Sequence, residues 1–158
     1  MTEVQPAYEP AAVWAQIEAQ HAACRRLTEE ALPLNKTALF DALAAAGVTS
    51  VVVTFDGCGD FGQIESMDAF DGESVVDLPA VAIEIATPAW DGSTLERKTL
   101  PVAEAIEALA YAFLADTHGG WENNGGAFGE FTFDVAERTI GLDYNERIET
   151  SEYSGHSW

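Results

Sequence analysis

The sequence predicts an α+β protein with a largely antiparallel sheet of about five strands and helices packed on one face, in the order ααβββαββ. Three observations support this prediction. Three segments repeat apolar residues at helical spacing, and five shorter segments are rich in apolar residues that alternate with polar ones. Short turns join most neighbouring strands, so hairpins dominate and the strands are expected to run antiparallel.

The predicted helices begin and end at recognisable signals. Pro10 suits the first turn of a helix, and Pro33 separates the first helix from the second. Asn35 fits the N-cap of the second helix, and Gly47 stands in the usual place for a left-handed C-terminal stop. The third helix carries a broad apolar stripe, which we expect to lie on the sheet. The helices are predicted over residues 10–31, 35–46 and 101–116.

Five segments alternate in the manner of strands. In the first, Val51, Val53 and Phe55 fall on one face and Asp56 falls on the other. A glycine-rich turn follows, and the chain returns as the second strand of a hairpin. Residues 74–78 could add a brief strand. The five strands are predicted over residues 48–56, 63–67, 80–86, 130–135 and 139–147.

The chain of 158 residues is long enough to bury about two-thirds of the surface that its unfolded form would expose. We expect a disordered N-terminus over residues 1–9, a single α+β domain over residues 10–148 and a C-terminal tail over residues 149–158. The start lacks the pattern of a signal peptide, and no stretch reaches the roughly 18 to 20 apolar residues of a membrane span. These features predict a cytoplasmic protein without membrane contact. Cys24 and Cys58 fit reduced thiols.

Charge is the most informative part of the composition. The formal net charge is −20, from 27 Asp and Glu against seven Lys and Arg, and no basic residue lies between Lys36 and Arg97. Such a chain repels nucleic acid and anionic lipid, and it attracts either divalent cations or a basic protein surface. The alternative is that the charge only confers solubility.

Two groups of residues define a candidate site. If the apolar face of each strand meets the helices, the other face of the sheet is acidic. Two glycine-rich loops, residues 57–62 and 119–129, could meet at one edge of that sheet. Trp121 and Phe128 would then either anchor a partner or pack under their own loop. The acidic residues expected on the open face are Asp56, Glu84, Glu130, Asp134 and Asp143.

Binding through this acidic face is the preferred function. DNA presents about one charge per 1.7 Å of axis, so a rigid array of carboxylates can imitate it and occupy a basic groove. The sequence thus favours an interaction protein for the basic surface of a protein partner, with nucleic-acid mimicry and inhibition of a DNA- or RNA-binding partner as its specific form. It would bind neither nucleic acid nor membrane, and it would need no cofactor. The predicted binding residues are Asp56, Asp60, Glu65, Glu84, His118, Trp121, Glu122, Asn123, Asn124, Glu130, Asp134 and Asp143.

The alternative is a site for a divalent metal ion. Mg²⁺ and Ca²⁺ take oxygen ligands, which Asp56, Asp60, Glu65 and Glu122 could supply from the two glycine-rich loops. This spacing does not match a helix-loop-helix calcium loop. A hydrolase would pair His118 with Glu122 or with Asp60, because a histidine oriented by a carboxylate suits proton transfer near neutral pH.

Several segments resemble a bacterial domain family of unknown function that occurs in alphaproteobacteria, often near mobile elements. The resemblance covers most of residues 33–158 and implies neither an established activity nor catalytic residues. Phe61 stands where that family tends to have a small hydroxyl residue, and Gly125 stands where it tends to have an acid. The genetic setting favours interference with host nucleic-acid machinery, which is an anti-defence role. The matching segments are PLNKTALF at 33–40, FDGCGDFGQIE at 55–65, HGGWENN at 118–124, GEFTFD at 129–134 and LDYNER at 142–147.

Overall fold

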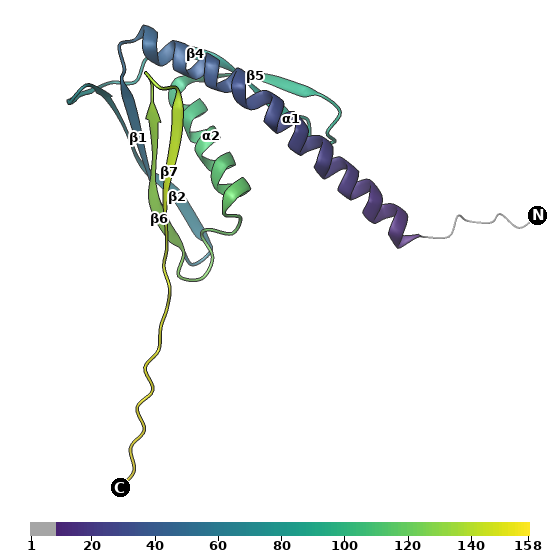
Figure 1. The fold of residues 1–158 in the computed structure, drawn as a ribbon, viewed down its shortest axis with the longest axis vertical. Coiled ribbons are helices and arrows are strands. Elements are labelled where there is room, and N and C mark those ends of the chain that lie inside the picture. Colours follow the sequence, from purple (N-terminus) through teal and green to yellow (C-terminus); the bar gives the residue numbers. More distant parts are fainter. Residues whose placement is uncertain (1–8) are drawn as a thin grey trace, which may run out of the picture. The chain divides into compact units, whose positions relative to one another are not determined.

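A computed structural model of the protein describes residues 9–158. The fold is α+β, as predicted, with a five-stranded antiparallel sheet (Figure 1). The disordered segment predicted at residues 1–9 lies outside the described residues, except for Glu9. The elements are α1 (Pro10–Ala45), β1 (Ser50–Cys58), β2 (Phe61–Asp71), β3 (Ser74–Val76), β4 (Ala82–Pro88), β5 (Leu95–Pro101), α2 (Val102–Thr117), β6 (Ala127–Asp134) and β7 (Thr139–Glu146).

The chain divides into two compact units. The first unit holds the chain up to Ala38 together with Glu84–Thr99, and the second holds Leu39–Ile83 together with Leu100–Trp158. Five of the seven Lys and Arg lie in the first unit, so the second unit carries most of the uncompensated acid. The single domain expected over residues 10–148 stays a prediction. No helix in the described part of the chain is both long and apolar enough to cross a membrane.

The second unit contains the five-stranded sheet, in the order β3-β2-β1-β6-β7. Each neighbouring pair is antiparallel, and β1 and β2 form the predicted hairpin. The central strand β1 alternates as expected, because Val51, Val53 and Phe55 are buried while the intervening side chains are partly exposed. The strand expected at residues 63–67 is longer, and the brief strand expected near residue 75 is β3.

Helices cover one face of this sheet. Phe131 and Phe133 point from β6 to that face, because alternate residues of a strand share a side. The Phe131 ring lies 6.2 Å from the ring of Phe113 on α2, and the Phe133 ring lies 6.5 Å from the ring of Phe40 near the end of α1. The end of α1 comes at the predicted stop, where Gly47 has a positive φ of 77°. Figure 1 shows α2 alongside the strands.

The expected break between two N-terminal helices is wrong, since α1 is one helix of 36 residues with Pro33 inside it. Asn35 is not an N-cap. Its side chain is buried and pairs with the backbone of Ala86 in β4, donating from Nδ2 to the carbonyl at 2.9 Å and accepting the N–H at 2.7 Å. Asn35 and Ala86 both lie in the first unit. These two hydrogen bonds are made with Asn35 inside the helix. They offset part of the roughly 3 kcal/mol that a proline in the helix interior costs.

The strand predicted at residues 80–86 does not join the main sheet. It is β4, and it pairs with β5 in a two-stranded sheet, although residues 89–99 were expected to be a connection. Glu84 is therefore not on the acidic face of the main sheet, and its carboxylate instead pairs with Arg97 at 2.8 Å. Backbone pairing with β4, rather than its own apolar pattern, makes β5 a strand.

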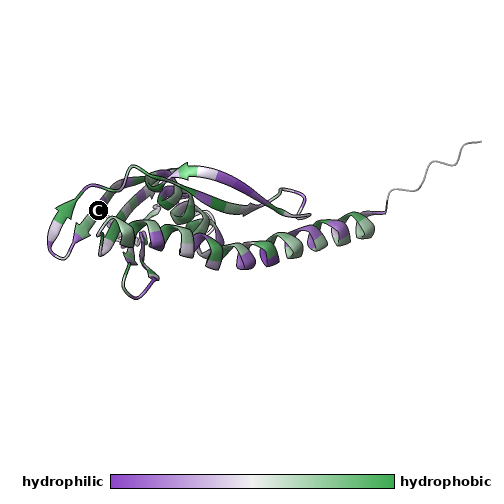
Figure 2. Cartoon of the chain, turned by 90° about the horizontal axis from the view of Figure 1, so that it is seen from above, coloured by the Kyte–Doolittle hydropathy of each residue, from purple (hydrophilic) through white to green (hydrophobic). Residues whose placement is uncertain are grey.

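In the first unit, α1 presents apolar and polar residues side by side along its length (Figure 2). Gln20 donates from Nε2 to the carbonyl of Trp90 at 2.7 Å, and the Cys24 thiol lies 3.8 Å from the carbonyl of Ala89. The side chains of Trp14 and Trp90 are exposed.

Candidate functional site

The open face of the main sheet carries a carboxylate in every cross-strand row. The residues of β1 on this face are at positions 50, 52, 54 and 56. Each is paired across the sheet with residues of β2, β6 and β7, and these paired residues form one row. Neighbouring strands are about 4.8 Å apart and alternate residues of one strand about 7 Å apart, so these groups form a two-dimensional array. The carboxylates in the rows are Asp134, Asp68, the pair Glu130 and Asp143, and Asp56.

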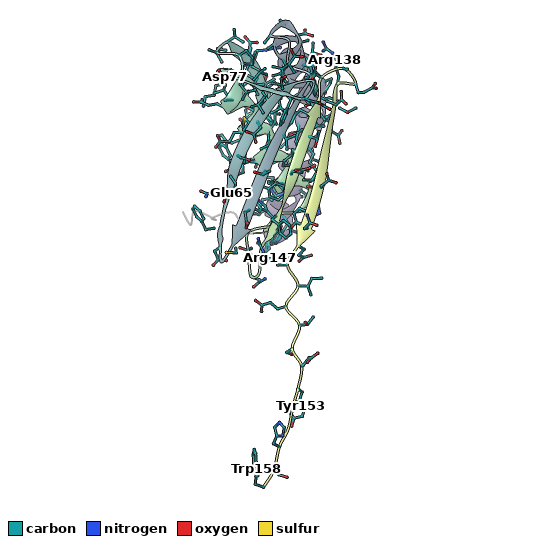
Figure 3. All side chains as sticks on the ribbon, turned by 90° about the vertical axis from the view of Figure 1, so that its left-hand side faces the viewer. Glu65, Asp77, Arg138, Arg147, Tyr153 and Trp158 are labelled. Atoms are coloured by element: carbon teal, nitrogen blue, oxygen red, sulfur yellow. The ribbon has the colours of Figure 1, made fainter. Side chains whose placement is uncertain are left out.

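The most acidic row holds two carboxylates side by side. Glu130 on β6 lies directly opposite Asp143 on β7, and like charges in that position destabilise a sheet. No Lys or Arg occurs in any of the five strands. The only Lys or Arg of the second unit are Arg138 and Arg147, which lie at opposite ends of β7 (Figure 3).

A bulge brings a further acid to this face. The pairing of β1 with β2 passes from Thr54–Ser66 to Phe55–Ile64, so Glu65 has no partner across the ladder. The Ile64 N–H donates instead to the Tyr111 hydroxyl of α2, at 2.9 Å. Because of the bulge, Ile64 before it and Met67 and Ala69 after it are all paired with buried residues of β1 and so share the helix side.

A hollow of about 510 Å³ lies on the open face around these residues. We call it the acidic hollow, because four of the predicted binding residues line it and its remaining wall includes the half-exposed ring of Phe128. The four acids are Asp56, Glu65, Glu130 and Asp143.

The two glycine-rich loops meet, as the sequence predicts. The Gly59 N–H donates to the carbonyl of Asn124 at 3.2 Å, and the Asp60 N–H donates to the carbonyl of Glu122 at 3.1 Å. Gly59 and Asp60 both have positive φ, as the two central residues of a tight type I′ hairpin turn require. Asp60 therefore acts through its backbone in joining the loops.

The indole of Trp121 packs against the backbone of Gly57 and Gly62. Gly57 and Gly62 are cross-strand partners at the end of the β1–β2 hairpin. A Cβ at Gly57 would lie 2.6 Å from the Trp121 ring, and a Cβ at Gly62 would lie 2.4 Å from it. The ring also meets Phe55 edge to face, with centroids 5.4 Å apart. Trp121 is thus a packing residue of the loop, and the glycines are required because the indole lies against the backbone.

Arg147 connects the acidic hollow to the two glycine-rich loops. It was not among the predicted site residues. Its guanidinium donates to both carboxylate oxygens of Asp56, at 2.9 and 3.0 Å, and to the carbonyl of Gly57 at 3.0 Å. A longer contact of 3.4 Å reaches the carbonyl of Gly125. The same group lies 4.9 Å from the centroid of the Phe128 ring. Asp56 is therefore the one acid of the hollow that is neutralised by an ion pair within the described chain.

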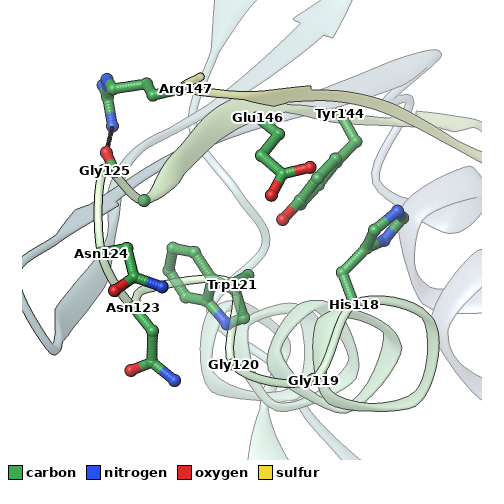
Figure 4. A pocket seen from close by; sticks show the side chains of 11 residues that line it. His118, Gly119, Gly120, Trp121, Asn123, Asn124, Gly125, Tyr144, Glu146 and Arg147 are labelled. Carbon is green, nitrogen blue, oxygen red and sulfur yellow. Dashed lines mark hydrogen bonds between the residues drawn. The ribbon is translucent and has the colours of Figure 1, made fainter. Parts of the chain in front are cut away.

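A second pocket, of about 220 Å³, lies beside the loop at residues 118–126, and we call it the loop pocket (Figure 4). His118 stacks on Tyr144 of β7, with ring centroids 3.7 Å apart and an interplanar angle of 13°. Burial raises the pKa of the Tyr144 hydroxyl above its usual value, and the charges of Glu146 and Glu122 raise it further. Tyr144 was not predicted as a site residue, because its apolar ring on the helix side suggested only packing.

The structure separates the predicted site residues into groups. The carboxylates of the sheet lie on the open face. Tyr144, by contrast, shares the helix-side face with Phe55, so the loop pocket opens at the end of the sheet on that side. The two hollows share no residue. The predicted residues that line the loop pocket are His118, Trp121, Asn123 and Asn124.

The residues proposed as metal ligands do not form a metal cluster. Among residues 9–158, no group of three or more His, Cys, Asp or Glu side chains is placed to hold a metal ion. The Asp56 carboxylate is engaged by Arg147, and the hydrogen bond between Asp60 and Glu122 joins their backbones. The geometry therefore gives the metal alternative no support.

Comparison with known proteins identifies the family to which the chain belongs. No curated protein and no solved structure was found to match the chain. A family model described as "Family of unknown function (DUF6878)" matches residues 31–158, which is most of the chain and includes both hollows. The chain therefore belongs to this family of unknown function, DUF6878.

Proposed function

We propose that the protein binds the basic surface of a protein partner through the open face of its five-stranded sheet. The acidic hollow is the observation that carries this proposal. Three of its four carboxylates belong to no ion pair of the described residues, and the opposed pair Glu130 and Asp143 costs stability in the free protein. A basic group entering the hollow would remove that repulsion, which favours the bound state.

The specific form of this function is nucleic-acid mimicry. The strands hold carboxylates at fixed spacings on a rigid face, and a basic groove that binds phosphates would meet them as a similar array. Phe128 and Asn145 line the same hollow and supply an apolar and an amide contact. The partner is then a DNA- or RNA-binding protein that the complex inhibits. The genetic setting of the resembling family makes an anti-defence target a natural candidate.

The test uses two variants with the same net charge. The face variant combines Asp68→Asn, Glu130→Gln and Asp143→Asn. The control variant removes three exposed acids of α1, at Glu18, Glu29 and Glu30. Each protein, immobilised at low salt, is exposed to an extract of a bacterial host, and retained proteins are eluted with duplex DNA, with RNA or with salt.

We expect a basic protein to be retained by the wild type and the control, and to be released by nucleic acid. The face variant should lose it, because only that variant changes the array. Equal retention by the face variant and the control would reject the open face as the binding surface. Retention that nucleic acid cannot displace would reject mimicry while leaving the binding face in place.

A further inference from the structure

The loop pocket has the chemistry of a binding site for an organic cation. We propose that it binds a guanidinium or ammonium group, carried either by a basic side chain or by a small molecule. The site goes beyond the proposed function, because the loop pocket and the acidic hollow share no lining residue.

Two hydrogen-bond acceptors lie together in the pocket. The Glu146 carboxylate and the Tyr144 hydroxyl line it side by side (Figure 4), and Asn123 and Asn124 also line the pocket, on the far side of Trp121. Glu146 belongs to no ion pair of the described residues. A guanidinium has five N–H donors and an ammonium has three, so either can donate to the Glu146 carboxylate and the Tyr144 hydroxyl at once.

Aromatic rings complete the pocket. Trp121 and His118 line it on either side of Tyr144 (Figure 4). Trp121 is held in place by Gly57 and Gly62, and Tyr144 is held between His118 and Phe55. Because His118 and Phe55 stack on Tyr144, this residue contributes its hydroxyl rather than a ring face. The fixed indole of Trp121 is then the ring that attracts a cation, at little entropic cost, and indole is the strongest aromatic group for such a contact.

The charge around the pocket favours a cation over an anion. The carboxylate of Glu146 lines the pocket, and the charges of Glu146 and Glu122 add to burial in raising the pKa of the Tyr144 hydroxyl, so the surroundings of the pocket are acidic. Arg147 also lines the pocket, but its guanidinium is occupied by Asp56 and by backbone carbonyls. A ligand phosphate or carboxylate would therefore meet net repulsion.

The volume sets the size of the ligand. About 220 Å³ is below the range of roughly 300–1,000 Å³ that is typical of drug-sized ligands. It suits a single side chain or a short polyamine. An isolated group of that size binds weakly, and we expect a Kd of about 1 mM.

The test uses a variant in which Trp121 is the single tryptophan, so that its fluorescence reports on the pocket. Trp14, Trp90 and Trp158 are exposed and are replaced by Phe, which leaves the indole of the pocket as reporter. The probes are N-acetyl-arginine amide for a side chain and agmatine for a small molecule. N-acetyl-citrulline amide, which has nearly the same shape without the charge, is the matched neutral control.

We expect a saturable change in Trp121 fluorescence with at least one cationic probe and none with the citrulline compound. The better of the two cationic probes identifies the source of the cation. Glu146→Gln, at an exposed position that should not affect folding, should weaken binding about tenfold, because a charge-assisted hydrogen bond is lost. Glu137→Gln removes the same charge from an exposed position in the β6–β7 turn and should leave binding unchanged.

Equal responses to the arginine and citrulline compounds would overturn the proposal, and so would equal losses in Glu146→Gln and Glu137→Gln. The face variant with Asp68→Asn, Glu130→Gln and Asp143→Asn should keep full binding of the cationic probe. This last result separates the two proposals, because the open face can fail as a partner surface while the loop pocket still binds its cation.

Discussion

The guanidinium of Arg147 donates two hydrogen bonds, of 2.9 and 3.0 Å, to the carboxylate of Asp56, and it links the end of β7 to the end of β1. The same group reaches the carbonyls of Gly57 and Gly125, which belong to the two glycine-rich loops. One side chain thus holds together the acidic hollow, the β1–β2 hairpin and the loop pocket.

Arg147→Ala should lower the free energy of unfolding by about 1–2 kcal/mol, because it leaves a carboxylate and a backbone carbonyl without their donor. The ion pair is partly exposed, so solvent screening keeps its own share below about 1 kcal/mol. Arg147→Lys should restore little, since lysine cannot donate in the same forked geometry. Urea unfolding measures both. Arg138→Ala, which loses only an exposed pair with Asp41, should cost less than about 0.5 kcal/mol, and an equal loss there would contradict a special role for Arg147.

Gly57→Ala and Gly62→Ala should each cost about 1–3 kcal/mol, because the new methyl group overlaps the indole of Trp121. Gly141→Ala is the control, since a Cβ there meets nothing within 4 Å, and it should be neutral or slightly stabilising. Thermal unfolding compares the three. The cost of Gly62→Ala should shrink in a Trp121→Ala background, and a purely additive double mutant would refute contact with the ring as the cause.

Asn35→Ala should cost about 2–4 kcal/mol, because it removes both hydrogen bonds to Ala86 and leaves that backbone buried without partners. Amide hydrogen exchange gives a local reading, in which the Ala86 N–H should exchange much faster. Thr28→Ala loses only an exposed hydrogen bond within α1, so it should change neither quantity. An unchanged exchange rate at Ala86 would show that the Asn35 pairing does not form in solution.

Glu130→Gln should stabilise the free protein by about 0.2–1 kcal/mol while it weakens partner binding, because it removes the repulsion from Asp143. The gain should fade as salt is added. Denaturant titrations at low and high salt measure this effect, with Glu137→Gln as the control for net charge. A loss of stability in Glu130→Gln would mean that the carboxylate has a favourable role in the free fold.

Tyr144 should make stability sensitive to alkaline pH. Its pKa is raised in the folded protein, so its contribution is complete below the ordinary tyrosine pKa of about 10 and is lost as pH rises through the folded pKa. Tyr144→Phe should remove this part of the alkaline decline. Phenolate absorbance follows the titration, and Glu146→Gln should lower the Tyr144 pKa without restoring its ordinary value, since burial is the larger cause. A Tyr144 that titrates normally would contradict the described packing.

Much of the fold follows from local pattern. Alternation in β1 placed Val51, Val53 and Phe55 inside, and Gly47 ended α1 where a left-handed stop was expected. Local pattern failed where tertiary contacts decide. Pro33 signals a break, yet pairing of Asn35 with Ala86, 51 residues away, keeps the helix intact. The strand β5 has no alternating apolar pattern to detect.

The site shows the same limit. Alternation along the strands was enough to predict an acidic open face, although Glu84 was wrongly placed on it, and the two glycine-rich loops meet as expected. It did not reveal Arg147, whose partner Asp56 is 91 residues earlier in the chain. It did not reveal Tyr144 either, because its role depends on the ring of His118 from another element. Such pairings are set by the register of β6 and β7, which no short segment specifies.

The position of β1 in the sheet constrains the order of folding during synthesis. This strand leaves the ribosome early and can pair at once with β2, but its other edge must wait for β6, which is made about 70 residues later. Until then Val53 and Phe55 lack half of their neighbours, and an open strand edge is exposed to other chains. We therefore expect the nascent protein to be most prone to misassociation in the interval before β6 emerges, and slow translation over that interval to lower its yield.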